Sequence, residues 1–263
     1  MQQVTQISHV SFSGLKIWNE CPFKYRLNYV DKIGKFAGNV FTAFGTAMHE
    51  VCEKTLKNEW KEGDAALNFQ KSFIHEIEVL PAQIKEDTQQ ELVDAMMDQG
   101  ALLAPEAIPG LKSFFKEFEV VSLEENLMEP IEGVDNKFKG FVDLLLRTPD
   151  GKYHIVDWKT CSWGWDMRRK SDKMTTYQLT LYKHFIAKKH NIPPEMIETY
   201  FALLKRTAKK NRVEIFRVTS GKRKTENALQ LLDKALFSIN KGFYPKNRLS
   251  CSKCELHRTQ FCP

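Results

Sequence analysis

Residues 137–160, KFKGFVDLLLRTPDGKYHIVDWKT, predict the β-hairpin around which the chain is organised. Two segments rich in apolar and β-branched residues, Phe138–Arg147 and Tyr153–Lys159, are separated by Thr148-Pro149-Asp150-Gly151. Proline fixes its own φ and glycine accepts a positive φ, so these four residues favour a tight turn. The two segments are therefore expected to pair as antiparallel strands.

Three polar residues interrupt the apolar pattern of this hairpin: Asp143, Asp157 and Lys159. Asp143 lies in the run FVDLLL, which is expected to be buried on both faces, and an unpaired buried carboxylate is destabilising unless a cation or strong donors lie beside it. Asp157 and Lys159 are two residues apart, so they share one face of a strand. We expect the two acids and the lysine to converge at one end of the hairpin.

This set of side chains is typical of metal-assisted phosphodiester hydrolysis. Mg²⁺ and Mn²⁺ prefer carboxylate oxygens and usually retain waters for the nucleophile and substrate. A lysine beside the metal can hold the attacking water and offset negative charge in the transition state. A plain salt bridge between Asp157 and Lys159 on a solvated strand face is the alternative interpretation.

Gly140-Phe-Val-Asp143, followed by Ile155-Val-Asp157-Trp-Lys159-Thr160, resembles the core of the PD-(D/E)XK nucleases. It most resembles the RecB-like branch, which includes the nuclease domains of bacterial RecB and AddB, phage RecB-like exonucleases and the CRISPR-associated adaptation exonucleases. The resemblance implies a mixed α/β fold, with a restriction-endonuclease-like core of a small central sheet flanked by helices and a helical insertion. It also implies catalytic roles for Asp143, Asp157 and Lys159.

A helix expected over about residues 45–61 carries Gly45-Thr-Ala-Met-His49-Glu50-Val-Cys-Glu53. His49 and Glu53 are four residues apart and share a helix face. The pattern resembles the family's first motif, which implies that His49 binds the metal together with Asp143, Asp157 and the carbonyl of Trp158. Glu53, or alternatively Glu50, is expected to contact the ligands. A structural or exposed histidine is the other interpretation.

A helix expected over residues 174–190 places Gln178 and Tyr182 one turn apart. By resemblance this is the signature helix of the RecB-like branch, and both side chains would line the catalytic site on the side of the scissile strand. In the loop before it, Trp163 and Trp165 are candidates to stack on unpaired bases. The cations Arg168, Arg169 and Lys170 are candidates to contact phosphates. A tryptophan-anchored loop with a solvated basic tip is equally compatible with these residues.

Three of the six cysteines, Cys251, Cys254 and Cys262, lie close together near the C-terminus. In a reducing compartment such clustering favours a metal or cluster site over disulfides. Cys21 is the natural fourth ligand, and the resemblance implies a 4Fe-4S cluster that joins the two ends of the chain. The last cysteine spacing is longer than in the family, so a Zn²⁺ site in which His257 replaces Cys21 stays open.

The remaining elements are predicted from hydrophobic periodicity, caps and breakers. We expect a helix over residues 11–30 that restarts at Pro22, a loop over 31–42, and two or three helices between 64 and 118, interrupted at Pro105, Pro109 and Gly110. Strands are expected over 119–130, 197–205 and 213–218, and a helix over 227–240. We expect one domain, 1–263, in which 62–118 is a helical insertion and 243–263 plus Cys21 forms an iron–sulfur staple.

Composition and missing motifs limit the classes of function that the sequence allows. The 263 residues carry 39 Lys and Arg against 33 Asp and Glu, a net charge of +6 that mildly favours a polyanionic partner. No membrane span or signal segment is visible, so a cytoplasmic protein of a phage or prokaryote is expected. No Walker motif is visible either, so a helicase or recombinase partner would be a separate protein.

We therefore expect a metal-dependent DNA exonuclease acting on single-stranded or frayed ends in recombination, repair or replication. Two alternatives remain open from the sequence: a non-catalytic, DNA-binding iron–sulfur subunit of a larger nuclease or helicase complex, and an RNA-directed nuclease of the same fold.

Overall fold

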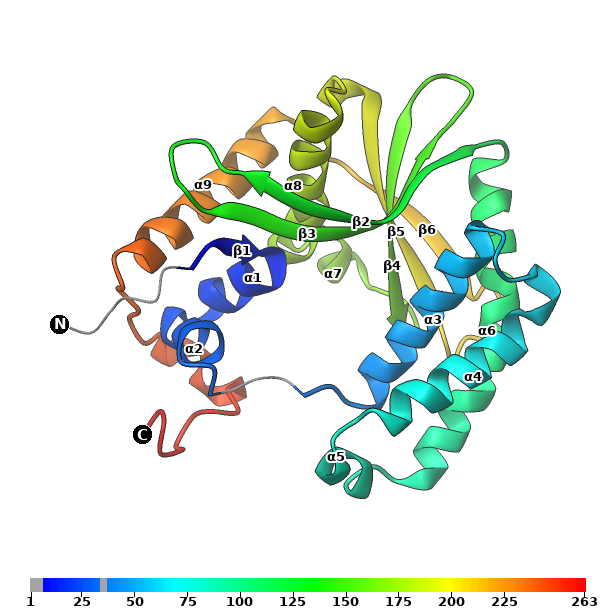
Figure 1. The fold of residues 1–263 in the computed structure, drawn as a ribbon, viewed down its shortest axis with the longest axis horizontal. Coiled ribbons are helices and arrows are strands. Elements are labelled where there is room, and N and C mark those ends of the chain that lie inside the picture. The colour runs from blue at the N-terminus through cyan, green and yellow to red at the C-terminus, as the bar shows by residue number, and fades with distance from the viewer. Residues whose placement is uncertain (1–6, 34–36) are drawn as a thin grey trace.

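The structure is a computed structural model that describes residues 7–33 and 37–263. Within these residues six strands form one mixed sheet with helices on both faces (Figure 1). The strands are β1 (His9–Ser11), β2 (Glu119–Pro130), β3 (Lys137–Arg147), β4 (Tyr153–Cys161), β5 (Ile197–Lys205) and β6 (Val213–Val218). The α-helices are α1 (Phe12–Glu20), α2 (Pro22–Tyr25), α3 (Val40–Leu56), α4 (Ala65–Glu78), α5 (Ala82–Glu86), α6 (Gln90–Phe115), α7 (Met167–Ser171), α8 (Lys173–His190) and α9 (Lys222–Asn240).

The strand β3 is the centre of the sheet. It pairs antiparallel with β2 along one edge, and on the other edge with β1 near its start and with β4 near its end. The β3–β4 pairing is confirmed as the predicted hairpin, turning at 148–152. Beyond β4 the sheet continues with a parallel partner, β5, and an antiparallel edge strand, β6.

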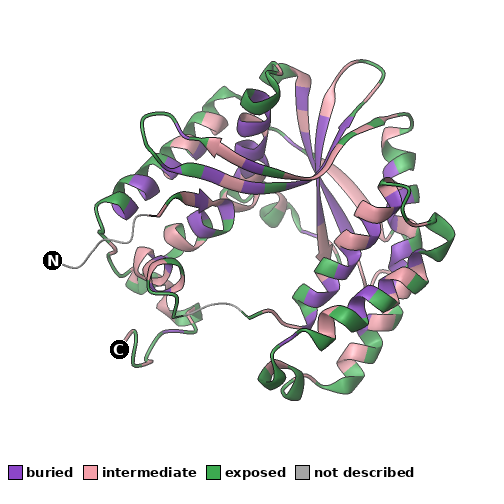
Figure 2. Cartoon of the chain, viewed as in Figure 1, coloured by how far each residue is buried: buried purple, intermediate pink, exposed green. Residues whose placement is uncertain are grey.

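Two hydrophobic cores lie on the two faces of this sheet, visible as buried layers between strands and helices (Figure 2). One core packs α1, α8 and α9 against the sheet around residues such as Phe138 and Phe185. The other packs α3, α4 and α6 around Phe69 and Trp158. On this face α3 and α6 lie against the strands, and α4 packs on both of these helices.

Most predicted elements are confirmed, although α3 ends at Leu56 rather than near 61 and α9 begins at Lys222 rather than 227. Helix α3 begins at Val40 rather than near residue 45, because Asn39 accepts from the backbone N–H groups of Phe41 and Thr42 and forms a capping box. The predicted interruption at Pro105 and Pro109 is wrong, because α6 runs unbroken from Gln90 to Phe115. Tertiary packing holds α6 against α3, α4 and β6, and this outweighs the two backbone N–H groups lost at the prolines.

The helix predicted over 11–30 is confirmed, with Pro22 separating α1 from α2 and a π-helical turn over Arg26–Val30. The short strand β1 before it was not predicted. Within the predicted loop over 31–42, residues 34–36 lie outside the described residues. The predicted loop after β4 contains the short helix α7. Among the described helices, none combines the length and the apolar content that a membrane span requires.

Candidate active site

The candidate site lies where β4 separates from β3. Between Lys139, which pairs with β1, and Leu144, which pairs with β4, the edge of β3 has no strand partner among the described residues. At this position the carboxylate of Asp143 replaces a backbone partner, because its Oδ2 accepts the backbone N–H of Trp158 at 2.7 Å. The side chain of Asp143 is thereby fixed beside the end of β4 that carries Asp157 and Lys159.

The predicted convergence of two acids and a lysine is present. Asp157 is 1% exposed, and Lys159 Nζ lies 2.5 Å from its Oδ2. That oxygen has no aligned hydrogen-bond donor among the described residues, although it is buried. The Lys159 ammonium lies against this oxygen, whose remaining lone pairs are of the kind that a hard cation binds.

His49 on α3 lies against both strands. Its Nε2 is 3.0 Å from the carbonyl oxygen of Trp158, and its Nδ1 is 3.6 Å from Asp143 Oδ2. In the tautomer that donates from Nε2, the lone pair of Nδ1 faces the carboxylate. The predicted ligand set of His49, Asp143, Asp157 and the Trp158 carbonyl is thus brought together, with the carbonyl already engaged by the imidazole.

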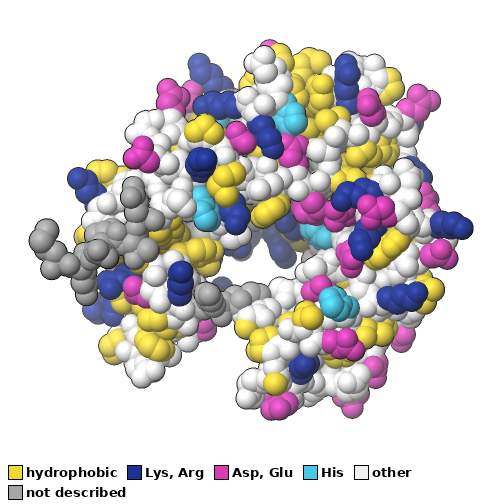
Figure 3. All heavy atoms as spheres, viewed as in Figure 1, with side chains coloured by type: hydrophobic (Ala, Val, Ile, Leu, Met, Phe, Trp, Pro, Cys, Tyr) yellow, Lys and Arg dark blue, Asp and Glu magenta, His cyan; other side chains and the backbone are white. Residues whose placement is uncertain are grey.

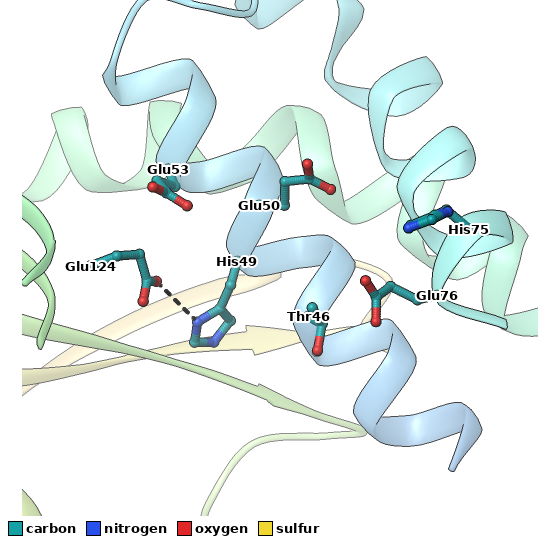
Figure 4. Close-up of a pocket in the computed structure, with 8 residues that line it drawn as sticks. Thr46, His49, Glu50, Glu53, His75, Glu76 and Glu124 are labelled. Atoms are coloured by element: carbon teal, nitrogen blue, oxygen red, sulfur yellow. Dashed lines mark ion pairs between the residues drawn. The ribbon is translucent and has the colours of Figure 1, made fainter. Parts of the chain in front are cut away.

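Glu124 on β2 completes this group and was not predicted from the sequence. Its Oε1 lies 3.9 Å from His49 Nδ1 (Figure 4), and ligand atoms of His49, Glu124 and Asp143 lie within 4.8 Å of one another. Register explains the position, since Leu123 and Glu125 pair with Leu144 and Val142, which places Glu124 opposite Asp143. Its φ of 46° is a left-handed conformation that is strained for a glutamate.

The electrostatics of the group follow from burial and from the proximity of the two acids. Burial, reinforced by the charge of Asp157, raises the pKa of Asp143 to about 7. Burial alone would lower the pKa of Lys159, but the charges of Asp157 and Asp143 outweigh it, so that the pKa is raised and the ammonium keeps its proton. A bound divalent cation would favour the ionised form of Asp143.

Helix α8 supplies the other predicted residues. Gln178 Nε2 donates to Asp157 Oδ1 at 2.9 Å and to the Tyr182 hydroxyl at 3.3 Å. Tyr182 approaches β3 closely, because a Cβ added to Gly140 would lie 2.8 Å from its ring. The glycine of the Gly140-x-x-Asp143 pattern therefore makes room for the tyrosine. Gln178 and Tyr182 border the buried acids from the side opposite α3.

An acidic pocket of about 580 Å³ opens beside His49 (Figure 4). Its walls carry Glu50 and Glu53 from α3, His75 and Glu76 from α4, and Glu124. Glu50 pairs with Lys54 and Glu53 with Lys57 on the helix surface. Figure 3 shows the molecule hollowed between the side formed by α1 and α2 and the side formed by α3 and α4, with Lys and Arg side chains at the back of the hollow.

The two tryptophans of the loop after β4, both predicted to stack on bases, differ in their exposure to solvent. Trp163 is 78% exposed, whereas Trp165 is 8% exposed and packs on Phe201 and Phe216. The guanidinium of Arg169 lies 4.4 Å from the Trp165 ring. The prediction that Trp165 stacks on a base is therefore wrong in this structure, because core residues and a cation occupy its ring. Trp163 and Arg168 remain available at the surface.

The C-terminal segment packs against the first helices (Figure 1). The backbone N–H of Asn247 donates to Cys21 Sγ at 3.3 Å, Phe23 N–H donates to the carbonyl of Pro245, and Lys24 pairs with Glu255 at 3.0 Å. Cys21 is buried, Cys251, Cys254 and Cys262 are half-buried, and His257 is exposed. Within the described chain, no three of these sulfurs lie within 4.8 Å of one another.

The PD-(D/E)XK nuclease superfamily model matches residues 9–263, nearly the whole chain. The chain belongs to the PD-(D/E)XK nuclease superfamily. This membership agrees with the mixed sheet, with the hairpin that carries Asp143, Asp157 and Lys159, and with the helices on both faces. The restriction-endonuclease-like fold predicted from the sequence is thereby confirmed.

A solved structure shares the fold. It is described as a "putative exonuclease" from Eubacterium rectale and is 15% identical with a TM-score of 0.60, covering 97% of this chain and 90% of that chain. At this identity the likeness concerns the fold alone. The structure of SSO0001 is 13% identical with a TM-score of 0.34, covering 66% of this chain and 76% of that one, and supports no further argument. No curated protein matches the sequence.

Proposed function

We propose that this chain is a divalent-metal-dependent deoxyribonuclease that removes nucleotides from single-stranded or frayed DNA ends. The observation that carries the proposal is the convergence of Asp143, Asp157 and Lys159 on one pair of strands, with His49 facing them. The family membership supports nuclease chemistry, and the fold shared with a "putative exonuclease" is compatible with exonucleolytic cutting.

The donor set fits Mg²⁺ or Mn²⁺. Asp143, Glu124 and His49 offer ligand atoms within 4.8 Å of one another, and the buried Asp157 Oδ2 lacks an aligned donor. We assign these four residues and the Trp158 carbonyl to metal binding. When bound, the cation would supply Lewis-acid activation of the phosphodiester and of a coordinated water.

The other side chains then have separate roles. Lys159 keeps its proton at Nζ, where it can hold the attacking water and offset charge that develops on the phosphate. Gln178 orients Asp157 through its amide, and Tyr182 shares that amide from the next turn of α8. Trp163, Arg168 and Arg169 lie on or near the loop that follows β4, where they would contact the substrate strand.

We further propose that the chain belongs to the RecB-like branch and holds a 4Fe-4S cluster through Cys21, Cys251, Cys254 and Cys262. The support is the contact of the C-terminal segment with α1 and α2, together with an N–H to sulfur bond at Cys21 of the kind that surrounds cluster ligands. Four thiolates also suit Zn²⁺, which is the alternative metal. A separate helicase or recombinase would supply unwound DNA.

Digestion of end-labelled DNA tests the catalytic proposal. The protein should release labelled mononucleotides or short fragments from single-stranded DNA in Mn²⁺ or Mg²⁺, act more slowly on blunt duplex, and stop in chelator. Circular single-stranded DNA serves as the control for endonucleolytic cutting, and matched RNA tests the sugar. DNA binding without cutting under any metal would favour a non-catalytic subunit, and preferential cutting of RNA would overturn the substrate.

A further inference from the structure

Helix α3 lies alongside strand β4, so that residues one turn apart on α3 face residues two apart on β4. This contact continues along α3 past His49. Phe41, Gly45 and His49 are spaced four residues apart and share one face of α3. His49 Nε2 lies 3.0 Å from the Trp158 carbonyl, and a Cβ on Gly45 would lie 3.5 Å from Thr160 Oγ1. Four helical residues rise about 6 Å and two strand residues about 6.6 Å, so Phe41 falls beside the residues that follow Thr160.

There the ring of Phe41 lies beside the guanidinium of Arg206, which hydrogen bonds hold in place. The Arg206 guanidinium lies 5.4 Å from the centroid of the Phe41 ring. Arg206 is held by its backbone N–H, which donates to the Cys161 carbonyl, and by its guanidinium, which donates to Ser162 Oγ at 2.9 Å and Gln99 Oε1 at 2.6 Å. The ring itself remains 50% exposed. A fixed cation therefore lies against an aromatic ring that still has much of its surface open to solvent.

The chain has a second exposed aromatic residue next to a contact of Arg206. Trp163, 78% exposed, comes directly after Ser162, the residue that binds Arg206. We call Phe41, Trp163 and Arg206 the aromatic rim. Exposed aromatic rings, with cation–π contributions from arginine, are one kind of surface on which single-stranded nucleic acids stack their bases.

Charge indicates on which side of His49 a DNA strand would pass. Along α3 beyond His49 lie Glu50 and Glu53, whose carboxylates repel phosphates. The pocket also extends past Gly45 and Thr46 to Glu76 of α4 (Figure 4). In the direction from His49 toward Phe41 lie the rim and the exposed Lys209 and Lys210 of the β5–β6 turn. The rim lies about 12 Å along the helix from His49, a few nucleotides from the position of the cleaved phosphate.

We propose that the aromatic rim is a stacking site for an unpaired base of the substrate strand, with Phe41 as its central residue. The proposal rests on the nuclease function above and adds a reason for a preference for single strands, because a base in a duplex has no free face to stack on Phe41. The site is independent of sequence, since every base has a π-face.

The stacking site is tested by measuring the binding of a fluorescein-labelled oligothymidylate in chelator, where the DNA is not cleaved. Phe41→Ala should raise Kd by about 5- to 150-fold, the effect of one lost base–aromatic stack. Phe41→Tyr should bind like wild type, and Phe41→Leu, which keeps an apolar contact for Arg206, should bind like Phe41→Ala. The matched control is Phe237→Ala, an exposed phenylalanine on α9, which should leave Kd unchanged.

An abasic scan along the oligonucleotide adds a second readout. Wild type should bind more weakly when the abasic site stands at one position near the cleaved phosphate. Phe41→Ala should show no such loss at that position and should match the wild-type profile at all others. Equal Kd values and the same abasic profile in Phe41→Ala and Phe237→Ala, from a wild type that cuts DNA, would overturn the rim and leave the nuclease proposal standing. A wild type that neither binds nor cuts DNA would overturn both.

Discussion

At the scale of one residue, Asp143 lowers the stability of the folded protein when it is ionised and no cation is bound. Its carboxyl is buried, and its folded pKa of about 7 stands above the ordinary value of 3.8. As pH rises from about 4 to about 7, the unfolded chain gives up this proton before the folded protein does. The metal-free protein should therefore lose stability over that window and lose no more above it through this group.

Asp143→Asn should remove this loss, because the amide oxygen can still accept from Trp158 N–H without carrying charge. In chelator the variant should melt several degrees above wild type at pH 8 and about level with it near pH 4. In Mn²⁺ the order should reverse, since only wild type gains ligand-binding stabilisation. Thermal melts at several pH values check this, and profiles that run parallel at all pH values would count against a buried titrating Asp143.

The same scale shows what the sequence could and could not predict. Asp143, Asp157, Lys159 and His49 stand out because each is a polar residue in an apolar or motif-bearing context. Glu124 does not, since acids surround it in the strand and its relevance depends on pairing opposite Asp143. The paired acids Glu124 and Glu125 within an otherwise alternating strand were the one available signal. Trp165 was misjudged because a loop tryptophan can be exposed or buried, and only tertiary packing decides.

At the scale of elements, the strands and the hairpin could be predicted because each carries its own pattern. The course of α6 could not, because two prolines argue for a break and only packing against other elements keeps the helix whole. The contact with α4 is close at Gly100, where an added Cβ would lie 1.9 Å from the Phe69 ring. The sequence gives no sign of which glycine has this role.

Gly100→Ala should therefore destabilise the protein by roughly 1–3 kcal/mol, despite the higher helix propensity of alanine, because Phe69 is fully buried and must move. Gly63→Ala is the control, since nothing lies within 4 Å of its added Cβ. Chemical denaturation measures both. A Gly100→Ala variant as stable as wild type would show that α4 and α6 are less closely packed than described.

At the scale of the whole molecule, the C-terminal segment packs against α1 and α2. If Cys21, Cys251, Cys254 and Cys262 hold a 4Fe-4S cluster, the protein purified without oxygen should be brown. Each serine variant of these four should bleach it and lower the melting temperature, because the constraint between distant segments is lost. Cys52→Ser and Cys161→Ser should retain colour. Stoichiometric zinc without iron in metal analysis would contradict the cluster, and colour retained in Cys21→Ser would contradict only that ligand.

Two buried acids and a lysine on one sheet, with a histidine from helix α3, are proposed here to form a metal-dependent nuclease site. Lys159→Ala tests it most directly, because the lysine contacts Asp157 and is not assigned to the metal. In an Mn²⁺ assay on end-labelled single-stranded DNA, wild type should release label and Lys159→Ala should lose at least about 100-fold in rate. Mn²⁺ binding by calorimetry should persist in the variant. Cutting by Lys159→Ala at the wild-type rate would contradict the account.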